Sequence, residues 1–248
     1  MLIAPLLKIM RQLRDPKTGC EWDKVQTFKS IAPYTIEESY EVSDAIERND
    51  MEALKDELGD LLLQVVFHSQ IATDEGHFEF KDVVDAICNK MERRHPHIFG
   101  GADSSPGWEE IKASERKKDG NVSALDGVAM ALPALLRAQK IQKRAARVGF
   151  DWPHIKPVIA KVREELEEVE TASTPAEVQE EIGDLLFATV NLARHHGVDS
   201  ETALKDATVK FSTRFQSVEE QAGEHLEELT LEQLEIFWQR AKDIEKSA

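Results

Sequence analysis

The chain has 248 residues, 41% of them hydrophobic, which is enough for one large domain or two small ones with their own cores. Its 47 Asp and Glu residues against 31 Lys and Arg residues give a net charge of −16, which disfavours nucleic acid and anionic membranes as partners. A polyanionic ligand would therefore need a local group of cationic side chains or a metal ion.

No run of residues has the apolar length of a membrane span, and the start "MLIAPLLKIMRQLRDP" lacks the layout of a secretion signal. We therefore expect a cytoplasmic protein. The cysteines are Cys20 and Cys88, with no CxxC motif or Cys/His cluster around them, so we expect unpaired thiols in a reducing compartment.

In chain order, the first notable segments are "EESYEVSDAI" and "DELGDLLLQVV". Glu38 and Glu41 are three residues apart, as are Glu57 and Asp60, so on helices each pair projects from one face. The fifteen residues between Glu41 and Glu57 allow the first helix to end, turn and return. The spacing predicts a helical hairpin with four acids at its centre.

Downstream of these acids, Lys90 and Arg94 form an i, i+4 cationic pair, and "GWEEIK" carries Trp108. The polar segments "GGADSSPG" and "KASERKKDGN" follow, and then the apolar-periodic "ALPALLRAQKIQKRAARVGF". This part of the chain reads as a linker with a connecting helix.

The same seven positions then recur in the same order. The second set comprises Glu165, Glu168, Glu181, Asp184, Lys210, Arg214 and Trp238. We therefore divide the chain into a first repeat at residues 1–120, a linker and connecting helix at 121–147, and a second repeat at 148–248. Apolar residues recur at three and four throughout, which predicts an all-α chain. The prolines expected at or near helix breaks are Pro16, Pro33, Pro96, Pro106, Pro153 and Pro175.

Close carboxylates repel one another unless a cation lies between them, and oxygen-only ligands favour Mg²⁺, Mn²⁺ or Ca²⁺. For Glu37, Glu47, Glu167 and Glu170 a solvated helix face is the favoured reading. The helices that carry Glu57 and Glu181 continue into runs that are apolar nearly all round, so we expect their acids to stand against the core. Gly59 and Gly183 suggest a close helix approach there, although a simple packing role is equally open.

Each cationic pair alone reads as a surface feature, but its recurrence after an acidic quartet makes it a natural phosphate clamp. Trp108 and Trp238 are read about equally as core residues or as stacking partners for a base. Lys161 lies one turn before Glu165 and adds a positive group, whereas Tyr34 occupies the matching place in the first repeat. Glu180 lies beside Glu181, where it either adds an acid or faces water. These differences predict that the second repeat carries most of the turnover.

The arrangement "EESYE…ELGD" and "EELEE…EIGD", with the signatures "LRDPKTGCEWD" and "RAQKIQKRAARVGFDW", resembles the MazG family of nucleoside triphosphate pyrophosphohydrolases, in particular its tandem members. The resemblance implies an all-α, usually dimeric enzyme that uses Mg²⁺ to split nucleoside triphosphates into monophosphate and pyrophosphate. Glu165, Glu168, Glu181 and Asp184 then resemble the metal ligands, Lys210 and Arg214 the phosphate clamp, and Trp238 the nucleotide contact. Glu38, Glu41, Glu57, Asp60, Lys90, Arg94 and Trp108 match the same pattern in the first repeat.

Two other classes of protein remain as alternatives. A di-iron carboxylate bundle needs paired Glu-x-x-His motifs, but Glu92 and His95 have Ser212 and Phe215 at the matching places in the second repeat. A non-catalytic helical module, serving assembly or nucleotide sensing, would bind nucleotide and Mg²⁺ without turnover. No "GxxxxGK[ST]" loop occurs, so a glycine-rich phosphate cradle is absent from the sequence.

Overall fold

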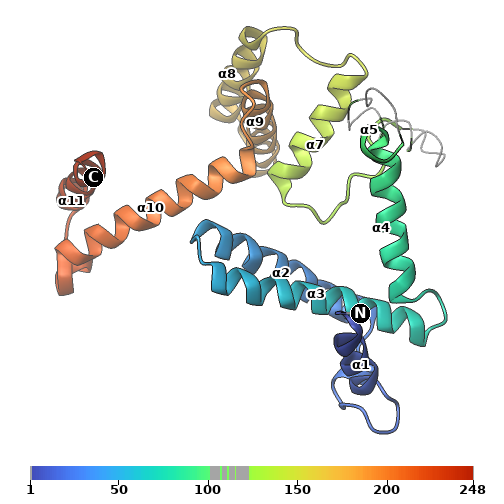
Figure 1. The fold of residues 1–248 in the computed structure, drawn as a ribbon. Helices are drawn as coiled ribbons and strands as arrows, with labels where there is room; N and C mark the ends of the chain where they lie inside the picture. The colour runs from blue at the N-terminus through green and yellow to red at the C-terminus, as the bar shows by residue number, and fades with distance from the viewer. Residues whose placement is uncertain (1, 101–106, 108–110, 112–114, 116–122, 248) are drawn as a thin grey trace. The chain divides into compact units, whose positions relative to one another are not determined.

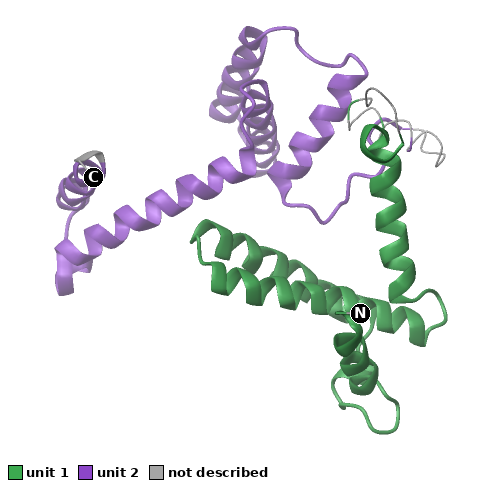
Figure 2. Ribbon diagram, in the orientation of Figure 1, with its two compact units in different colours: residues 1–114 green, residues 115–248 purple. Residues whose placement is uncertain are grey.

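A computed structural model describes residues 2–100, 107, 111, 115 and 123–247, and each regular element in these residues is a helix. The prediction of an all-α chain is confirmed. The chain divides into two compact units, residues 1–114 and 115–248 (Figures 1 and 2). Among the described residues, no helix is long and apolar enough to cross a membrane.

The first unit is built on an antiparallel hairpin of two long helices (Figure 1). Its elements are α1 (Ala4–Leu13), the one-turn η1 (Asp23–Val25), α2 (Phe28–Glu47), α3 (Met51–Asp74), α4 (Phe80–Arg94) and α5 (Pro96–Phe99). Helices α2 and α3 form the hairpin, α1 packs against α3, and α4 contacts α3 after the turn that follows it. The core consists of Met10, Ile31, Val66, Phe67 and Ile71.

Side-chain caps fix where the hairpin helices begin. Thr27 and Ser30 form a capping box at the start of α2, and the Asp50 carboxylate accepts a hydrogen bond from the Ala53 N–H at the start of α3. Pro33, which was expected near a break, lies inside α2. Packing of α2 along α3 outweighs the one backbone hydrogen bond that this proline removes.

The second unit contains a matching hairpin and three further long helices. Its elements are α7 (Ala134–Arg147), α8 (Ile155–Thr171), α9 (Pro175–His195), α10 (Ser200–Ala222), η2 (Gly223–Glu228) and α11 (Leu231–Ser247). Helices α8 and α9 form the hairpin, α7 packs against α9, and α11 packs against α10. The segment read as a linker with a connecting helix thus contributes α7 to the packing of this unit.

The acids of α3 and α9 were expected to stand against the core, but Asp60 and Asp184 are exposed, so that expectation is wrong for these two residues. The apolar surfaces of the two hairpins are not covered all round either. Leu58 and Leu62 on α3, and Ile182, Leu186 and Phe187 on α9, are exposed. The expected close helix approach at two glycines is also wrong, because a Cβ on Gly59 or Gly183 would meet no atom of the described chain within 4 Å. Each hairpin therefore presents an uncovered apolar face.

Candidate metal and nucleotide site

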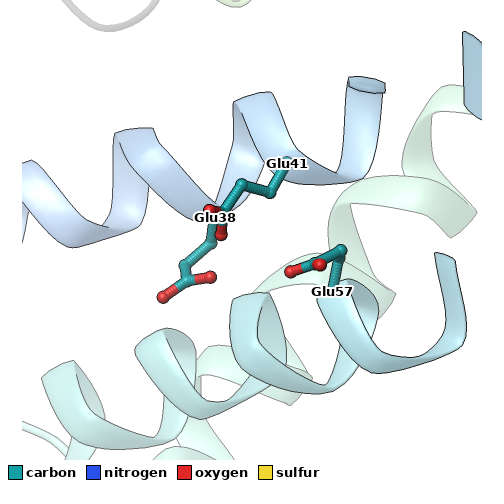
Figure 3. A group of neighbouring side chains, drawn as sticks. All are labelled: Glu38, Glu41 and Glu57. Atoms are coloured by element: carbon teal, nitrogen blue, oxygen red, sulfur yellow. The ribbon is translucent and has the colours of Figure 1, made fainter. Parts of the chain in front are cut away.

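In the first unit, three acids meet across the hairpin near its turn. Glu38 and Glu41 extend from α2 toward Glu57 on α3 (Figure 3). One carboxylate oxygen of each lies within 4.8 Å of the other two. The pKa of Glu38 is raised by its burial and by the charge of Asp60, which itself lies outside the group. Burial and the charge of Glu41 raise the pKa of Glu57 in the same way.

The second unit repeats this group with Glu165, Glu168 and Glu181, whose carboxylate oxygens again lie within 4.8 Å of one another. The neighbouring Glu165 carboxylate, which can accept a hydrogen bond from Glu168 when Glu168 is protonated, and burial raise the pKa of Glu168. Burial and the charges of Asp184, Glu165 and Glu180 raise that of Glu181. Asp184 lies outside the group of three, and Glu180 is exposed. Both groups are therefore sites of mutual repulsion that a cation would relieve.

Glu165 distinguishes the second site, because it is only 3% exposed. The Lys161 Nζ lies 2.7 Å from Glu165 Oε1 and 2.6 Å from Glu164 Oε1, and these carboxylates raise the pKa of the lysine. Glu165 Oε2 is buried and has no hydrogen-bond partner in the described part of the chain. A buried, unpartnered anionic oxygen among other carboxylates suits a hard divalent cation.

The acids expected to be solvated are exposed, which confirms that prediction. They are Glu37, Glu47, Glu167 and Glu170. None of these four acids belongs to either acidic group among the described residues.

A pocket of about 760 Å³ adjoins the second acidic group. Lys161, Glu165 and Asp184 line it on the hairpin side, and Gln142 of α7 and Trp152 line it elsewhere. The cavity of about 660 Å³ in the first unit lies between α1, α3 and α4, and Glu38, Glu41 and Glu57 do not line it. Of these two cavities, only that of the second unit is lined by a member of an acidic group, Glu165.

Aromatic side chains occupy the matching positions in the first unit. Trp22 packs edge-on against Tyr34 and Phe67, with ring centroids 6.1 and 6.3 Å apart. By the order of the repeats, these residues correspond to Trp152, Lys161 and Asn191, all of which line the pocket of the second unit. Tyr34 and Phe67, which pack against Trp22, thus stand where the second repeat has the pocket-lining Lys161 and Asn191.

The cationic pairs lie apart from the acids in their own units. Lys210 and Arg214 are on α10, which leads away from the α8–α9 hairpin (Figure 1), and neither lines the pocket. The Arg214 guanidinium donates to Glu245 at 2.6 Å and lies 5.8 Å from the centre of the Trp238 ring. Their proposed role in phosphate binding stays a prediction.

In the first unit, Lys90 and Arg94 lie toward the C-terminal end of α4, whereas the acids lie near the turn between α2 and α3 (Figure 1). Trp108 falls outside the residues that the structure describes. The His95 Nδ1–H donates a hydrogen bond to the backbone carbonyl of Met91 at 2.7 Å, so this ring is engaged at the end of α4.

An ion-pair cluster that the sequence did not indicate holds the segment after α7. Asp151 Oδ1 accepts hydrogen bonds from Arg194 at 2.5 Å and from His195 at 3.0 Å. The hydrogen bond from Arg194, which outweighs the opposing effect of burial, lowers the pKa of Asp151. The motif "GFDW" belongs to a signature of the second repeat, but nothing in its spacing indicates contact with the end of α9.

Comparison with known proteins identifies both repeats. Residues 26–99 match the model of the MazG nucleotide pyrophosphohydrolase domain, and residues 139–211 match that of phosphoribosyl-ATP pyrophosphohydrolase. The two matches lie in tandem and include the two hairpins.

Curated relatives extend the similarity over nearly the whole chain. A nucleoside triphosphate pyrophosphohydrolase of Escherichia coli K12 is 53% identical over 97% of both chains. The Thermotoga maritima protein named nucleoside triphosphate pyrophosphohydrolase/pyrophosphatase MazG is 47% identical over 98% of this chain and 96% of its own. A nucleoside triphosphate pyrophosphohydrolase of Mycolicibacterium smegmatis is 39% identical over 60% of this chain and 47% of its own.

Proposed function

Because the chain belongs to the MazG family of nucleoside triphosphate pyrophosphohydrolases, we propose that it hydrolyses ribo- and deoxyribonucleoside triphosphates to the monophosphate and pyrophosphate. The observation that carries the proposal is the second unit's pocket, where the unpartnered Glu165 oxygen lies beside Lys161. A chain of net charge −16 repels a triphosphate, which is itself a polyanion. To bind one, the chain needs cationic side chains and acids that hold a metal ion. In the cell, this activity would remove aberrant nucleotides from the cytoplasmic pool.

Mg²⁺, with Mn²⁺ as a substitute, would be held by Glu165, Glu168, Glu181 and Asp184. The set Glu38, Glu41, Glu57 and Asp60 would hold it in the first unit. A bound divalent cation neutralises triphosphate oxygens, activates water and stabilises the pyrophosphate leaving group. Support comes from the oxygen-only donor sets and from the raised pKa values of Glu168 and Glu181, which signal charges in need of a counter-ion.

Lys161 would turn from Glu165 to the phosphates once the acids are neutralised, since its ammonium now serves as their counter-ion. Glu180 would add negative charge at the edge of the metal site. Lys210 and Arg214 would grip the triphosphate tail, and Trp238 would contact the nucleotide. Lys90, Arg94 and Trp108 are the corresponding residues of the first repeat.

A homodimer would explain both the exposed apolar faces and the position of Lys210 and Arg214 on a helix that leads away from the acidic group. Exposed Ile182, Leu186 and Phe187 form a hydrophobic stretch on α9, beside the acidic group. Because Lys210 and Arg214 lie away from the acids of their own unit, a second copy is the natural source of a clamp across that face.

We assign most of the turnover to the second unit. Trp22, Tyr34 and Phe67 pack together in the first unit, whereas their counterparts line a pocket. The first unit would keep its metal-binding acids with weaker or more selective activity.

Product analysis with a panel of nucleoside triphosphates tests the activity. With Mg²⁺ or Mn²⁺ the expected products are monophosphate and pyrophosphate, and chelation should stop the reaction. Release of diphosphate and inorganic phosphate would refute it, and nucleotide binding without turnover would favour a sensing module. Glu168→Gln should remove most pyrophosphate release and Glu41→Gln should leave most of it; the reverse result would move the chemistry to the first unit.

A further inference from the structure

The wall of the second unit's pocket that comes from α7 contains a buried amide with one unused atom. Gln142 is 8% exposed, and its Nε2 donates to the Phe187 carbonyl at 2.8 Å. Because a carbonyl only accepts, this bond fixes the orientation of the amide and leaves Oε1 as an acceptor. Oε1 is buried and has no hydrogen-bond partner among the described residues. An unpaired buried acceptor is costly, which points to a ligand that donates to it.

The same pocket has an aromatic rim. Trp152 is 41% exposed and lines the pocket, and no ring in the described chain stacks on it. Phe150, which also lines the pocket, is 83% exposed. Asp151, between them, is bound to Arg194 and His195 of α9, which holds this short segment in place before any ligand arrives. Held aromatic rings beside a buried acceptor are suited to a flat heterocycle with N–H groups.

We propose that this pocket binds the nucleoside end of the substrate, with the base against Trp152 and an N–H on the base edge donating to Gln142 Oε1. The inference rests on the proposed function, because it assigns the two ends of a nucleoside triphosphate to one cavity. Glu165, Asp184 and Lys161 line the same cavity and receive the phosphate end. Gln142 is then a specificity-determining residue that favours bases with a donor on the six-membered ring.

A pair of buried glutamines on α7 supplies a matched test. Gln139 is 3% exposed, donates its Nε2 to the Val198 carbonyl at 3.0 Å, and also has an unpartnered Oε1. Unlike Gln142, it is not among the residues that line the pocket. Gln142→Met and Gln139→Met each remove one amide at nearly constant shape, so only the first should alter recognition of the base.

The substrates are ATP and purine riboside triphosphate, which has no N–H on its six-membered ring. The wild-type protein should favour ATP about tenfold in both kcat/KM and calorimetric affinity, the value of one hydrogen bond to a buried acceptor. Gln142→Met should abolish this preference and Gln139→Met should keep it. A preference that survives Gln142→Met, or its absence in the wild type, overturns the proposal. If neither nucleotide yields pyrophosphate, the proposed hydrolytic activity is refuted. The calorimetric affinities for the two nucleotides then still test whether the base binds beside Gln142.

Photolabelling of the unaltered protein with 8-azidoadenosine triphosphate provides a second measurement that no folding defect can disturb. The label should be found in the tryptic peptide of residues 148–161, which contains Trp152. Label confined to the peptide of residues 215–240, which contains Trp238, would instead transfer the base contact to that tryptophan.

Discussion

At the scale of single residues, the carboxylates of the second unit's acidic group repel one another, and a lysine neutralises part of their charge. Lys161 neutralises one oxygen of Glu165, but Glu168 and Glu181 keep raised pKa values. Their folded-state pKa values lie above the unfolded ones, so the penalty of their charge is full at neutral pH and disappears as the pH falls. The metal-free protein should therefore gain stability on mild acidification, before its other carboxylates protonate.

Glu168→Gln should consequently have opposite effects with and without metal. In a chelator, its melting temperature should rise by about 1–3 °C, because one repelling charge is gone. The stabilisation of the wild type by Mg²⁺ should be much reduced in this variant, since a ligand is lost. Calorimetric melting at pH 7 measures both effects. Glu167→Gln, an exposed neighbour outside the group, should change neither, and a fall in the chelated melting temperature of Glu168→Gln would contradict the repulsion.

If its guanidinium grips the charge-dense tail as proposed, Arg214→Ala should weaken triphosphate binding about tenfold or more and monophosphate binding much less. Titration calorimetry with both nucleotides measures the difference. Glu245→Gln is the control, since it removes the partner that now holds Arg214 but keeps the guanidinium. Equal losses for both nucleotides, accompanied by a lower melting temperature, would make Arg214 a structural residue.

The sequence was sufficient to identify Glu165 and Glu168 as candidates, because i, i+3 spacing places both on one helix face whatever the tertiary structure. The sequence was insufficient to identify Gln142 and Asp151 as candidates. Their surroundings come from α9, some forty residues away in each case, and no periodicity encodes such a contact. The unpartnered oxygen of Glu165 likewise depends on how α8 packs.

At the scale of elements, helix caps and periodicity account for the predicted hairpins. Thr174 and Glu177 form a capping box at the start of α9, as Thr27 and Ser30 do for α2. The same reasoning failed at Pro33 because local propensity competes with packing along the whole of α3. It also failed on burial, because an apolar helix surface in the sequence does not say whether the same chain or another one covers it.

The segment between α7 and α8 should depend on Asp151. Its pKa is lowered in the folded state, so its stabilisation is full above the unfolded pKa near 4 and is lost as the pH falls through the folded value. Asp151→Asn should therefore lower the free energy of unfolding by about 1 kcal/mol at pH 7 and by much less near pH 3. Urea unfolding at the two pH values measures this. An equal loss at both would show that the charge of Asp151 contributes nothing.

At the scale of the whole molecule, the uncovered apolar faces predict self-association. Leu186 on α9 and Leu62 on α3 occupy matching positions and are 51% and 40% exposed. Light scattering should give about twice the chain mass of 28.0 kDa for the wild type. If the second unit's face forms the interface, Leu186→Glu should shift the mass to that of a monomer, because a buried unpaired charge is costly.

Leu62→Glu is the matched variant for that experiment. A monomer from Leu62→Glu alone would place the interface on the first unit, and loss of dimer only in the double variant would show that both faces contribute. A wild-type protein that remains monomeric at high concentration would contradict the proposed dimer. Circular dichroism of each variant separates lost association from lost folding.

The aromatic packing of Trp22, Tyr34 and Phe67 bears on how a duplicated chain divides its labour. An open pocket with crowded charges is a burden on folding that an enzyme tolerates for the sake of its chemistry. With two copies in one polypeptide, one can keep the open pocket while side chains at the matching positions of the other pack against one another. A chain of this kind can lose a cavity in one half by ordinary mutation without losing its activity, and the surviving half then carries all of the selective constraint.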